Sequence, residues 1–181
     1  MSFSLSTLRA VPLLAGALAL CVQMIPPLLA QSPVKIVALG ASNTEGWGLS
    51  PEHAYPVRLQ ALLKAKGIDA TVVNAGIAGD TTGGMLGRLD SAVPAGTHIV
   101  ILQPGSNDER MGLGAERAAN IEKMRSQLAS RYTKLIVIEN SVLDALPRSE
   151  LRDDGVHFTP AGYAILAERI LPAVLTALGK Q

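Results

Sequence analysis

The side chains best suited to chemistry in this sequence are a serine in its first third and an aspartate–histidine pair near its end. Ser42 follows a short apolar run that stops at Gly40, whereas Asp154 and His157 lie three residues apart. A serine hydroxyl is a weak nucleophile until a base removes its proton, and a histidine oriented by a carboxylate can serve as that base. These residue types therefore indicate nucleophilic acyl transfer, although a serine at this position could simply cap a helix.

Small and polar residues follow three apolar runs and supply the other groups that acyl transfer needs. These stretches are residues 40–43 (GASN), 74–80 (NAGIAGD) and 105–108 (GSND). The carboxyl ends of parallel strands share one edge of a sheet, where open α/β folds place their ligands. Glycine lets the backbone approach a substrate oxygen closely, and an asparagine amide donates hydrogen bonds without adding charge. We therefore expect these stretches to converge on one site.

Strands and helices that would position these residues alternate along the chain. Strands are expected at residues 34–39, 70–73, 97–102 and 135–139, and helices at 50–67, 115–131 and from Thr159 onward. The strands are short β-branched runs, and a proline follows Ser50 and Thr159 as it does at helix starts. Pro172 is expected to kink or end the last helix. Four strands separated by helices predict an α/β fold with a parallel sheet covered on both faces.

The first thirty residues differ from the rest of the chain. Arg9 is the only charge before an uncharged run from Ala10 to Ala30, which ends on a small residue. This pattern is typical of a secretory signal peptide, but the run is also long enough to stay as a membrane anchor. We expect residues 1–30 to be a signal peptide or N-terminal anchor and residues 31–181 to be a single domain. The protein would then be periplasmic or secreted, or anchored to the membrane.

The composition argues against several other classes of function. Sixteen basic and 15 acidic residues nearly cancel, and aromatic residues make up only 3% of the chain, so nucleic-acid binding is not expected. Three scattered histidines and one cysteine offer no metal cluster. Residues 40–48 do not match a glycine-rich nucleotide loop. We expect no cofactor and no metal, and a small molecule as the partner.

Four stretches of the chain carry a resemblance to a known family. They are residues 39–49 (LGASNTEGWGL), 74–82 (NAGIAGDTT), 105–108 (GSND) and 154–163 (DGVHFTPAGY). In this order they resemble the sequence blocks of the SGNH or GDSL hydrolases, most of all the branch of acyl-CoA thioesterases, lysophospholipases and arylesterases. The resemblance implies a three-layer, flavodoxin-like fold. It also implies a serine hydrolase that cleaves carboxylic esters or thioesters through an acyl-enzyme.

The resemblance also implies a role for each matching residue. Ser42 would be the nucleophile, His157 the base, and Asp154 the carboxylate that orients the imidazole. The backbone N–H groups of Ser42 and Gly79, with the Asn107 side chain, would form the oxyanion hole. These roles agree with the chemistry of the residue types. Alternatives remain open at this point: Asp153 competes with Asp154, and the chain could be a carbohydrate acetylesterase or a catalytically impaired binding protein on the same scaffold.

The chain departs from the family pattern in two places. Ala41 stands where the family usually has the aspartate of its GDS triplet, which is not a triad member. Residues 140–152 are too few to hold both a crossover helix and a strand before Asp154. We therefore predict four strands in the order 2-1-3-4, without the family's fifth strand. One wall of the site would be low, so short-chain or bulky esters should be preferred over long-chain acyl groups.

Overall fold

The computed structural model of this protein describes residues 32–131 and 133–180. The predicted signal peptide or anchor, residues 1–30, lies outside the described residues. Within the part that is described, no helix is both long enough and apolar enough to cross a bilayer.

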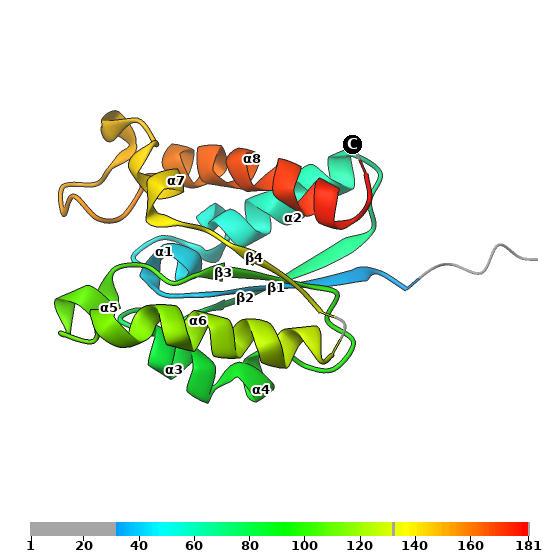
Figure 1. The fold of residues 1–181 in the computed structure, drawn as a ribbon. Coiled ribbons are helices and arrows are strands. Elements are labelled where there is room, and N and C mark those ends of the chain that lie inside the picture. Colours follow the sequence, from blue (N-terminus) through cyan, green and yellow to red (C-terminus); the bar gives the residue numbers. More distant parts are fainter. Residues whose placement is uncertain (1–31, 132, 181) are drawn as a thin grey trace, which may run out of the picture. The chain divides into compact units, whose positions relative to one another are not determined.

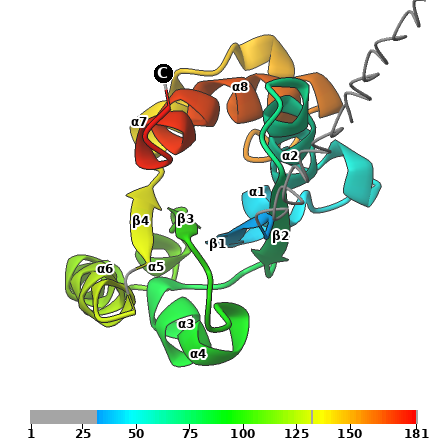
Figure 2. The ribbon, with the colours of Figure 1, turned by 90° about the vertical axis from the view of Figure 1, so that its right-hand side faces the viewer.

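A four-stranded parallel sheet forms the centre of the fold. Its strands are β1 (Val34–Gly40), β2 (Ala70–Gly76), β3 (Ile99–Gln103) and β4 (Lys134–Val137). Their order across the sheet is β2-β1-β3-β4, and every neighbouring pair is parallel. Figure 2 views the strands almost end-on in this order. The predicted fold class and strand order are therefore confirmed.

Helices cover both faces of the sheet, which gives the three layers seen in Figure 1. One face carries α2 (Tyr55–Ala65) and α8 (Pro160–Ala177). The other carries α3 (Thr82–Gly87), α4 (Leu89–Ala92) and α6 (Gly114–Ala129). A parallel sheet needs this double cover because its crossover helices fall on both faces.

The side chains of β1 alternate between two hydrophobic cores, one on each face of the sheet. Ile36 and Ala38 belong to the cluster under α2 and α8, whereas Val37 and Leu39 belong to the cluster on the opposite face. All four side chains are at most 1% exposed. Successive residues of a strand point to opposite faces, so an uninterrupted apolar run is what a strand buried on both sides requires.

The helix expected over residues 50–67 begins later than predicted. Pro51–His53 forms only a 3-10 turn, and α2 starts at Tyr55 after an extended Ala54 with φ −63° and ψ 141°. Pro56 explains the difference. A helix continuous from Pro51 would need an N–H from Pro56 for the carbonyl four residues earlier, and proline has none. In the first turn of α2 that missing N–H would be unpaired anyway.

Helix α8 begins where the sequence predicts but is longer than expected. The Thr159 hydroxyl accepts a hydrogen bond from the backbone N–H of Gly162 at 3.1 Å and so caps the helix. Pro172 does not end the helix, which continues to Ala177. Pro172 lies on the exposed side, where water can reach the carbonyl that it leaves unpaired, and the buried Val174 keeps the next turn on the core.

The chain between β4 and α8 adds no strand to the sheet. It contains α7 (Asn140–Asp144), a 3-10 turn at Arg148–Glu150 and an isolated antiparallel bridge between Leu151 and Phe158. Across the described residues the sheet keeps four strands, in agreement with the short connection seen in the sequence. This segment instead folds over the carboxyl edge of the sheet, beside the site described next.

Candidate active site

Ser42 lies just beyond the carboxyl end of β1. It is the first residue of the short helix α1 (Ser42–Glu45), in which Ala41 occupies the N-cap position and no side chain makes a capping hydrogen bond. The interpretation of Ser42 as a helix cap is therefore wrong. Its half-buried side chain instead lines a pocket at this edge.

The turn that carries Ser42 is fixed by its close packing on β2. A Cβ atom at Gly76 would lie 2.2 Å from the backbone nitrogen of Glu45, so only glycine permits this approach. Asn74 adds two hydrogen bonds, from its Nδ2 to the Glu45 carbonyl at 3.2 Å and from the Gly76 N–H to its Oδ1 at 3.0 Å. Polar and small residues after the second strand thus hold the helix that follows the first.

The Asp154 carboxylate and the His157 imidazole are in contact at the same edge of the sheet. Asp154 Oδ2 is 2.8 Å from His157 Nδ1, and Oδ1 accepts the backbone N–H groups of Val156 and His157, each at 2.9 Å. Hydrogen bonds from the His157 backbone and side chain, and then from the Val156 backbone, hold the pKa of the Asp154 carboxyl well below its usual range. Asp154 is therefore ionised at neutral pH. Asp153 is exposed and has no hydrogen bond to the imidazole among the described residues.

Asn43 joins the turn that carries Ser42 to the loop that carries His157. Its Nδ2 donates to the carbonyl oxygen of Val156 at 3.2 Å, and its Oδ1 accepts from the Tyr163 hydroxyl at 2.9 Å. Asn43 is 8% exposed and Tyr163 is fully buried. Burial raises the pKa of Tyr163 to about 12, so its hydroxyl keeps the proton that it donates. The two segments, far apart in sequence, are thus connected by one buried side chain.

Trp47 packs against the imidazole from the α1 side. The ring centroids of Trp47 and His157 are 4.9 Å apart, and Arg152 holds the tryptophan by donating to its carbonyl oxygen at 2.8 Å. His157 Nε2 is buried and has no hydrogen-bond partner within residues 32–131 and 133–180. The imidazole therefore has one nitrogen held by Asp154 and the other unoccupied, which is the arrangement of a base ready to accept a proton.

Gly79 and Asn107 lie in the loops that follow β2 and β3. Gly79 has a φ of 81°, which glycine adopts without strain. Asn107 begins α5 (Asn107–Arg110), and its Nδ2 donates to the Asp80 carbonyl oxygen at 2.8 Å. An amide nitrogen carries two hydrogens, so one remains for a ligand. The hydrogen bond joins Asn107 to the residue directly after Gly79.

Arg88 connects the loop that follows β2 to the ends of β1 and β2. Its Nε donates to Asp80 Oδ2 at 2.8 Å, and its Nη2 donates to the carbonyl oxygens of Gly40 at 3.2 Å and Ala75 at 2.9 Å. The Arg88 and Asp80 side chains are only 19% and 11% exposed. A planar guanidinium can satisfy several acceptors at fixed angles, so this side chain fixes the turn that contains Gly79 relative to the ends of β1 and β2.

A buried carboxylate anchors the helix that carries Asn107. Asp108 is 1% exposed and accepts hydrogen bonds from the backbone N–H and the hydroxyl of Thr82. Asn120 from α6 donates to the same Thr82 hydroxyl at 3.2 Å. Buried polar groups of this kind are costly unless they are paired, so the network links α5, α3 and α6 in one arrangement.

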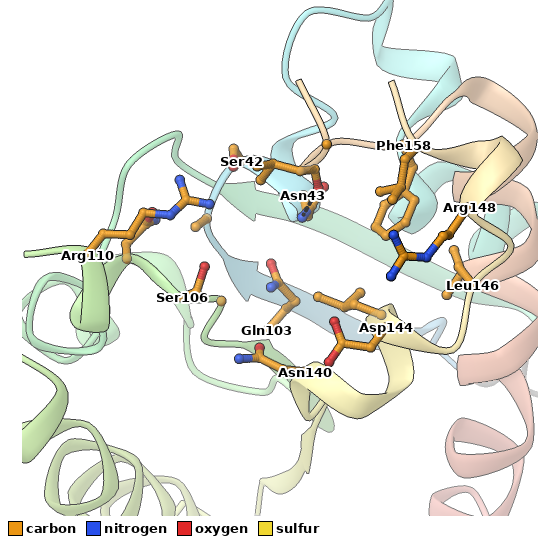
Figure 3. A pocket seen from close by; sticks show the side chains of 17 residues that line it. Ser42, Asn43, Gln103, Ser106, Arg110, Asn140, Asp144, Leu146, Arg148 and Phe158 are labelled. Carbon is orange, nitrogen blue, oxygen red and sulfur yellow. Dashed lines mark hydrogen bonds between the residues drawn. The ribbon is translucent and has the colours of Figure 1, made fainter. Parts of the chain in front are cut away.

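A pocket of about 440 Å³ opens beside Ser42. Figure 3 shows it between the Ser42 turn, the start of α5 and the segment that connects β4 to α8. Its polar lining includes Ser42, Asn43, Gln103, Ser106, Asn107, Arg110, Asn140, Asp144 and Arg148. Leu143, Leu146, Leu151, Val156 and Phe158 supply its apolar parts. The short connection, which is the segment between β4 and α8, therefore does form a wall of the pocket, and that wall is partly polar.

The described part of the chain brings together a nucleophile candidate, a carboxylate–imidazole pair and amide donors at one edge, with a pocket beside them. Within that same part, no group of three or more His, Cys, Asp or Glu side chains is placed to hold a metal ion. Groups of these types are the ones that acyl transfer by a serine nucleophile uses.

Sequence reasoning missed several residues that position this site. Asn43 lies inside a motif that was recognised, but its partners are residues 156 and 163, which a linear pattern does not connect to it. Arg88 and Asp108 act through buried contacts with no local signature. Gln103 is the last residue of β3, and the apolar pattern of that strand does not indicate that a polar side chain lines the bottom of the pocket. Only the pairing of strands and loops in space reveals these contacts.

Comparisons with known proteins identify the family to which this chain belongs. Residues 38–150 match the sequence model of the GDSL-like Lipase/Acylhydrolase family. The chain is 31% identical over 111 residues to an arylesterase of Vibrio mimicus (60% of this chain, 56% of that protein). It is 31% identical over 131 residues to the esterase TesA of Pseudomonas aeruginosa (70% and 62%). The chain thus spans less than two thirds of either relative.

Among solved structures, the crystal structure of TesA has a TM-score of 0.71 to this chain at 23% identity. The likeness covers 79% of this chain and 99% of that one. At this level of identity the similarity shows a shared fold.

Proposed function

Because this chain belongs to the GDSL-like lipase and acylhydrolase family, we propose that it is a serine hydrolase of carboxylic esters or thioesters, with Ser42, His157 and Asp154 as its catalytic triad. One observation carries the proposal. The His157 imidazole is held by Asp154 at 2.8 Å on one nitrogen and is unoccupied on the other, and Asn43 ties its loop to the turn of Ser42. The esterase names of both curated relatives support the same class of reaction.

The proposed reaction begins with attack by the Ser42 hydroxyl on the substrate carbonyl carbon. His157 Nε2 takes the hydroxyl proton as the new C–O bond forms, and the ionised Asp154 stabilises the resulting imidazolium. His157 then gives the proton to the leaving oxygen or sulfur as its bond to carbon breaks, which leaves the acyl group on Ser42. Water repeats the sequence with the same base, so the acid is released and both serine and histidine return to their starting forms.

The negative charge that develops on the carbonyl oxygen would be stabilised by the backbone N–H groups of Ser42 and Gly79 and by the free hydrogen of the Asn107 amide. Preorganised donors of this kind contribute because they need no reorganisation when the charge appears. The hydrogen bond from Asn107 to Asp80, and the ion pair of Asp80 with Arg88, support this assignment because they hold the Gly79 and Asn107 donors in place.

For the substrate, we propose esters with short acyl groups. The pocket of about 440 Å³ ends at α7 and the 3-10 turn of the short connection, and polar side chains interrupt its apolar lining. A long acyl chain needs a continuous apolar groove, because burial of each methylene is what holds it. A carbohydrate acetylesterase is a second candidate, since an acetyl group needs no long apolar groove and the lining is partly polar.

The test is ester hydrolysis by the purified protein and by a Ser42→Ala variant. With p-nitrophenyl acetate as substrate, loss of Ser42 should lower kcat by roughly 10⁶-fold when the triad acts as a unit. Ser126→Ala, on the exposed side of α6, is a matched control that should retain full activity. Ser106→Ala tests the other serine of the pocket. A protein that hydrolyses no ester would be a binding protein instead, as the Ala41 departure allows.

We also propose that residues 1–30 direct export and that residues 31–181 form the hydrolase domain. The charge of Arg9 followed by the uncharged run to Ala30 supports a signal peptide. N-terminal sequencing of the exported protein tests this, because a cleaved peptide gives a start near residue 31. An intact N-terminus in the membrane fraction would show an anchor.

A further inference from the structure

The pocket beside Ser42 is lined by several hydrogen-bond donors, and its charged side chains, within the described part of the chain, are two arginines and one carboxylate. Gln103, Ser106, Asn107, Arg110, Asn140 and Arg148 bring N–H or O–H groups to its lining, and Asp144 is its one carboxylate among the described residues. A binding site with this balance is complementary to a ligand that carries acceptor oxygens. Apolar acyl groups would leave these donors without partners.

Gln103 forms the base of this pocket and has an unused donor. Its side chain is 1% exposed, and its Oε1 accepts from the Thr44 hydroxyl at 3.2 Å. Its Nε2 is buried with no partner among the described residues. Figure 3 shows the amide at the base of the pocket. A buried amide hydrogen without an acceptor is unfavourable, so a substrate oxygen that reaches it through a small shift of the amide would gain more from this contact than from an exposed donor.

Two arginines without partners stand on opposite sides of the pocket. Arg110 extends from α5, and Arg148 extends from the 3-10 turn of the short connection (Figure 3). Neither guanidinium has an ion pair or a hydrogen bond to any other described residue, whereas four other arginines do form ion pairs: Arg88, Arg117, Arg125 and Arg131. Arg110 and Arg148 are thus available to a negatively charged ligand, and a guanidinium suits a carboxylate.

The acyl side of the substrate is the side that this pocket would hold. In the proposed mechanism His157 gives its proton to the leaving group, so the leaving group must point toward the imidazole. Ser42 and Asn107 line the pocket, but His157, Asp154 and Trp47 are not among its lining residues. The leaving group therefore lies outside the pocket, and the acyl group extends into it.

We propose that this enzyme selects esters whose acyl group carries a further acceptor oxygen, above all a terminal carboxylate, as in hemiesters of short dicarboxylic acids. The inference rests on the proposed function, because it concerns the acyl group that Ser42 would receive. Gln103 would bind an oxygen at the base of the pocket, and Arg110 or Arg148 would pair with the carboxylate. The short connection would then be a specificity wall that replaces a longer apolar one.

The experiment compares three p-nitrophenyl esters of equal acyl length: the hemiester of adipic acid, a keto-hexanoate and hexanoate. After subtraction of the uncatalysed rates, we expect kcat/KM to be about tenfold higher for the hemiester than for hexanoate, in line with a charge-assisted hydrogen bond weakened by exposure. The keto ester should lie between the two, because it offers an acceptor without charge.

Two variants and a control locate the effect. The double variant Arg110→Gln/Arg148→Gln should reduce the preference for the hemiester over the keto ester. Gln103→Leu should reduce the preference of both oxygen-bearing esters over hexanoate. Arg125→Gln, which removes an exposed arginine on α6 outside the pocket lining, should leave all these ratios as in the wild type.

The outcomes separate the two proposals. If none of the esters is hydrolysed, the proposed function fails. If hexanoate is hydrolysed as well as the hemiester or better, the proposed function stands and the acyl selectivity is overturned. If the hemiester is preferred but neither pocket variant changes the ratio, the selectivity does not come from this pocket and the inference is likewise overturned.

Discussion

The guanidinium of Arg88, at the junction of α3 and α4, lies 2.8 Å from the carboxylate of Asp80, which lies in the turn between β2 and α3. Asp80 is the residue between Gly79 and the Thr81 cap of α3, and its carbonyl oxygen is the acceptor of the Asn107 amide. The ion pair thus helps to fix both proposed oxyanion donors that lie beyond the Ser42 turn, alongside the buried Asp108 that anchors α5. Neither residue of the ion pair touches the proposed reacting atoms, so their role is positioning.

Arg88→Gln should therefore lower kcat by about 10²-fold with little change in KM, because a misplacement of about 1 Å in catalytic groups costs that much. Steady-state kinetics on p-nitrophenyl acetate measures kcat and KM separately, and Arg125→Gln is the matched control. Arg88→Lys should recover only part of the loss, because lysine cannot satisfy three acceptors at fixed angles. If the fraction of folded protein falls by the same factor as kcat, Arg88 has a structural role alone.

Asn107→Ala should lower kcat by about 10²–10³-fold with little change in KM, since its free amide hydrogen acts on charge that develops in the transition state. Asn107→Asp is an informative companion, because it keeps the shape but removes both donors. Asn107→Asp should lower kcat further than Asn107→Ala, because it also places a negative charge beside the developing oxyanion. If Asn107→Ala raises KM alone, Asn107 binds the ground state and does not belong to the oxyanion hole.

The pH dependence of kcat/KM should have an acid limb with a slope of one. Activity falls as pH decreases because the imidazole must be neutral to accept the Ser42 proton. Asp154 adds no second step in this range, because its hydrogen bonds hold its pKa well below the usual value. A slope of two would contradict an ionised Asp154.

The lowered pKa of Asp154 also affects the stability of the protein. Because the pKa of Asp154 is lower in the folded than in the unfolded protein, its contribution to stability is complete above its unfolded pKa of about 3.9 and is lost as pH falls below it. Urea denaturation of the wild type and of Asp154→Asn should therefore show a stability difference at neutral pH that shrinks in acid. A difference that grows as pH falls would contradict this sign.

Tyr163→Phe should destabilise the protein by about 1–3 kcal/mol, because it leaves the buried Asn43 Oδ1 without a donor while keeping the shape of the ring. Urea denaturation measures the change. Tyr55→Phe is a matched control: the Tyr55 hydroxyl is also buried, but its polar neighbour is the Thr44 hydroxyl, which donates to Gln103 Oε1 instead, so its removal should cost less. Equal effects of the two changes would show that the Asn43 contact adds nothing.

The sequence predicts the sheet well because short β-branched runs between turn residues leave few other choices. β2 nevertheless extends to Gly76, beyond its predicted end at residue 73, because residues 74–76 continue the pairing with residues 38–40 of β1. Strand ends depend on such partners in space, which a linear pattern does not contain.

The short helices at the carboxyl edge could not be predicted in the same way. α3 reads TGGMLG, and glycine is a poor helix former. It forms because the Thr81 hydroxyl caps it and the buried Asp108 accepts both donors of Thr82. The candidate triad residues were accessible to sequence reasoning because their chemistry is carried by residue type, whereas the contacts that position them depend on tertiary structure.

The end of the sheet at β4 also affects how the protein meets other copies of itself. β4 pairs with β3 on one side, and within the described residues no strand pairs with its other side. An open edge of this kind can recruit a strand from another chain and begin aggregation. β4 is only four residues long and starts with the exposed Lys134, and both features oppose such pairing. A sheet that ends at β4 is thus compatible with a protein that does not aggregate through this edge at high concentration.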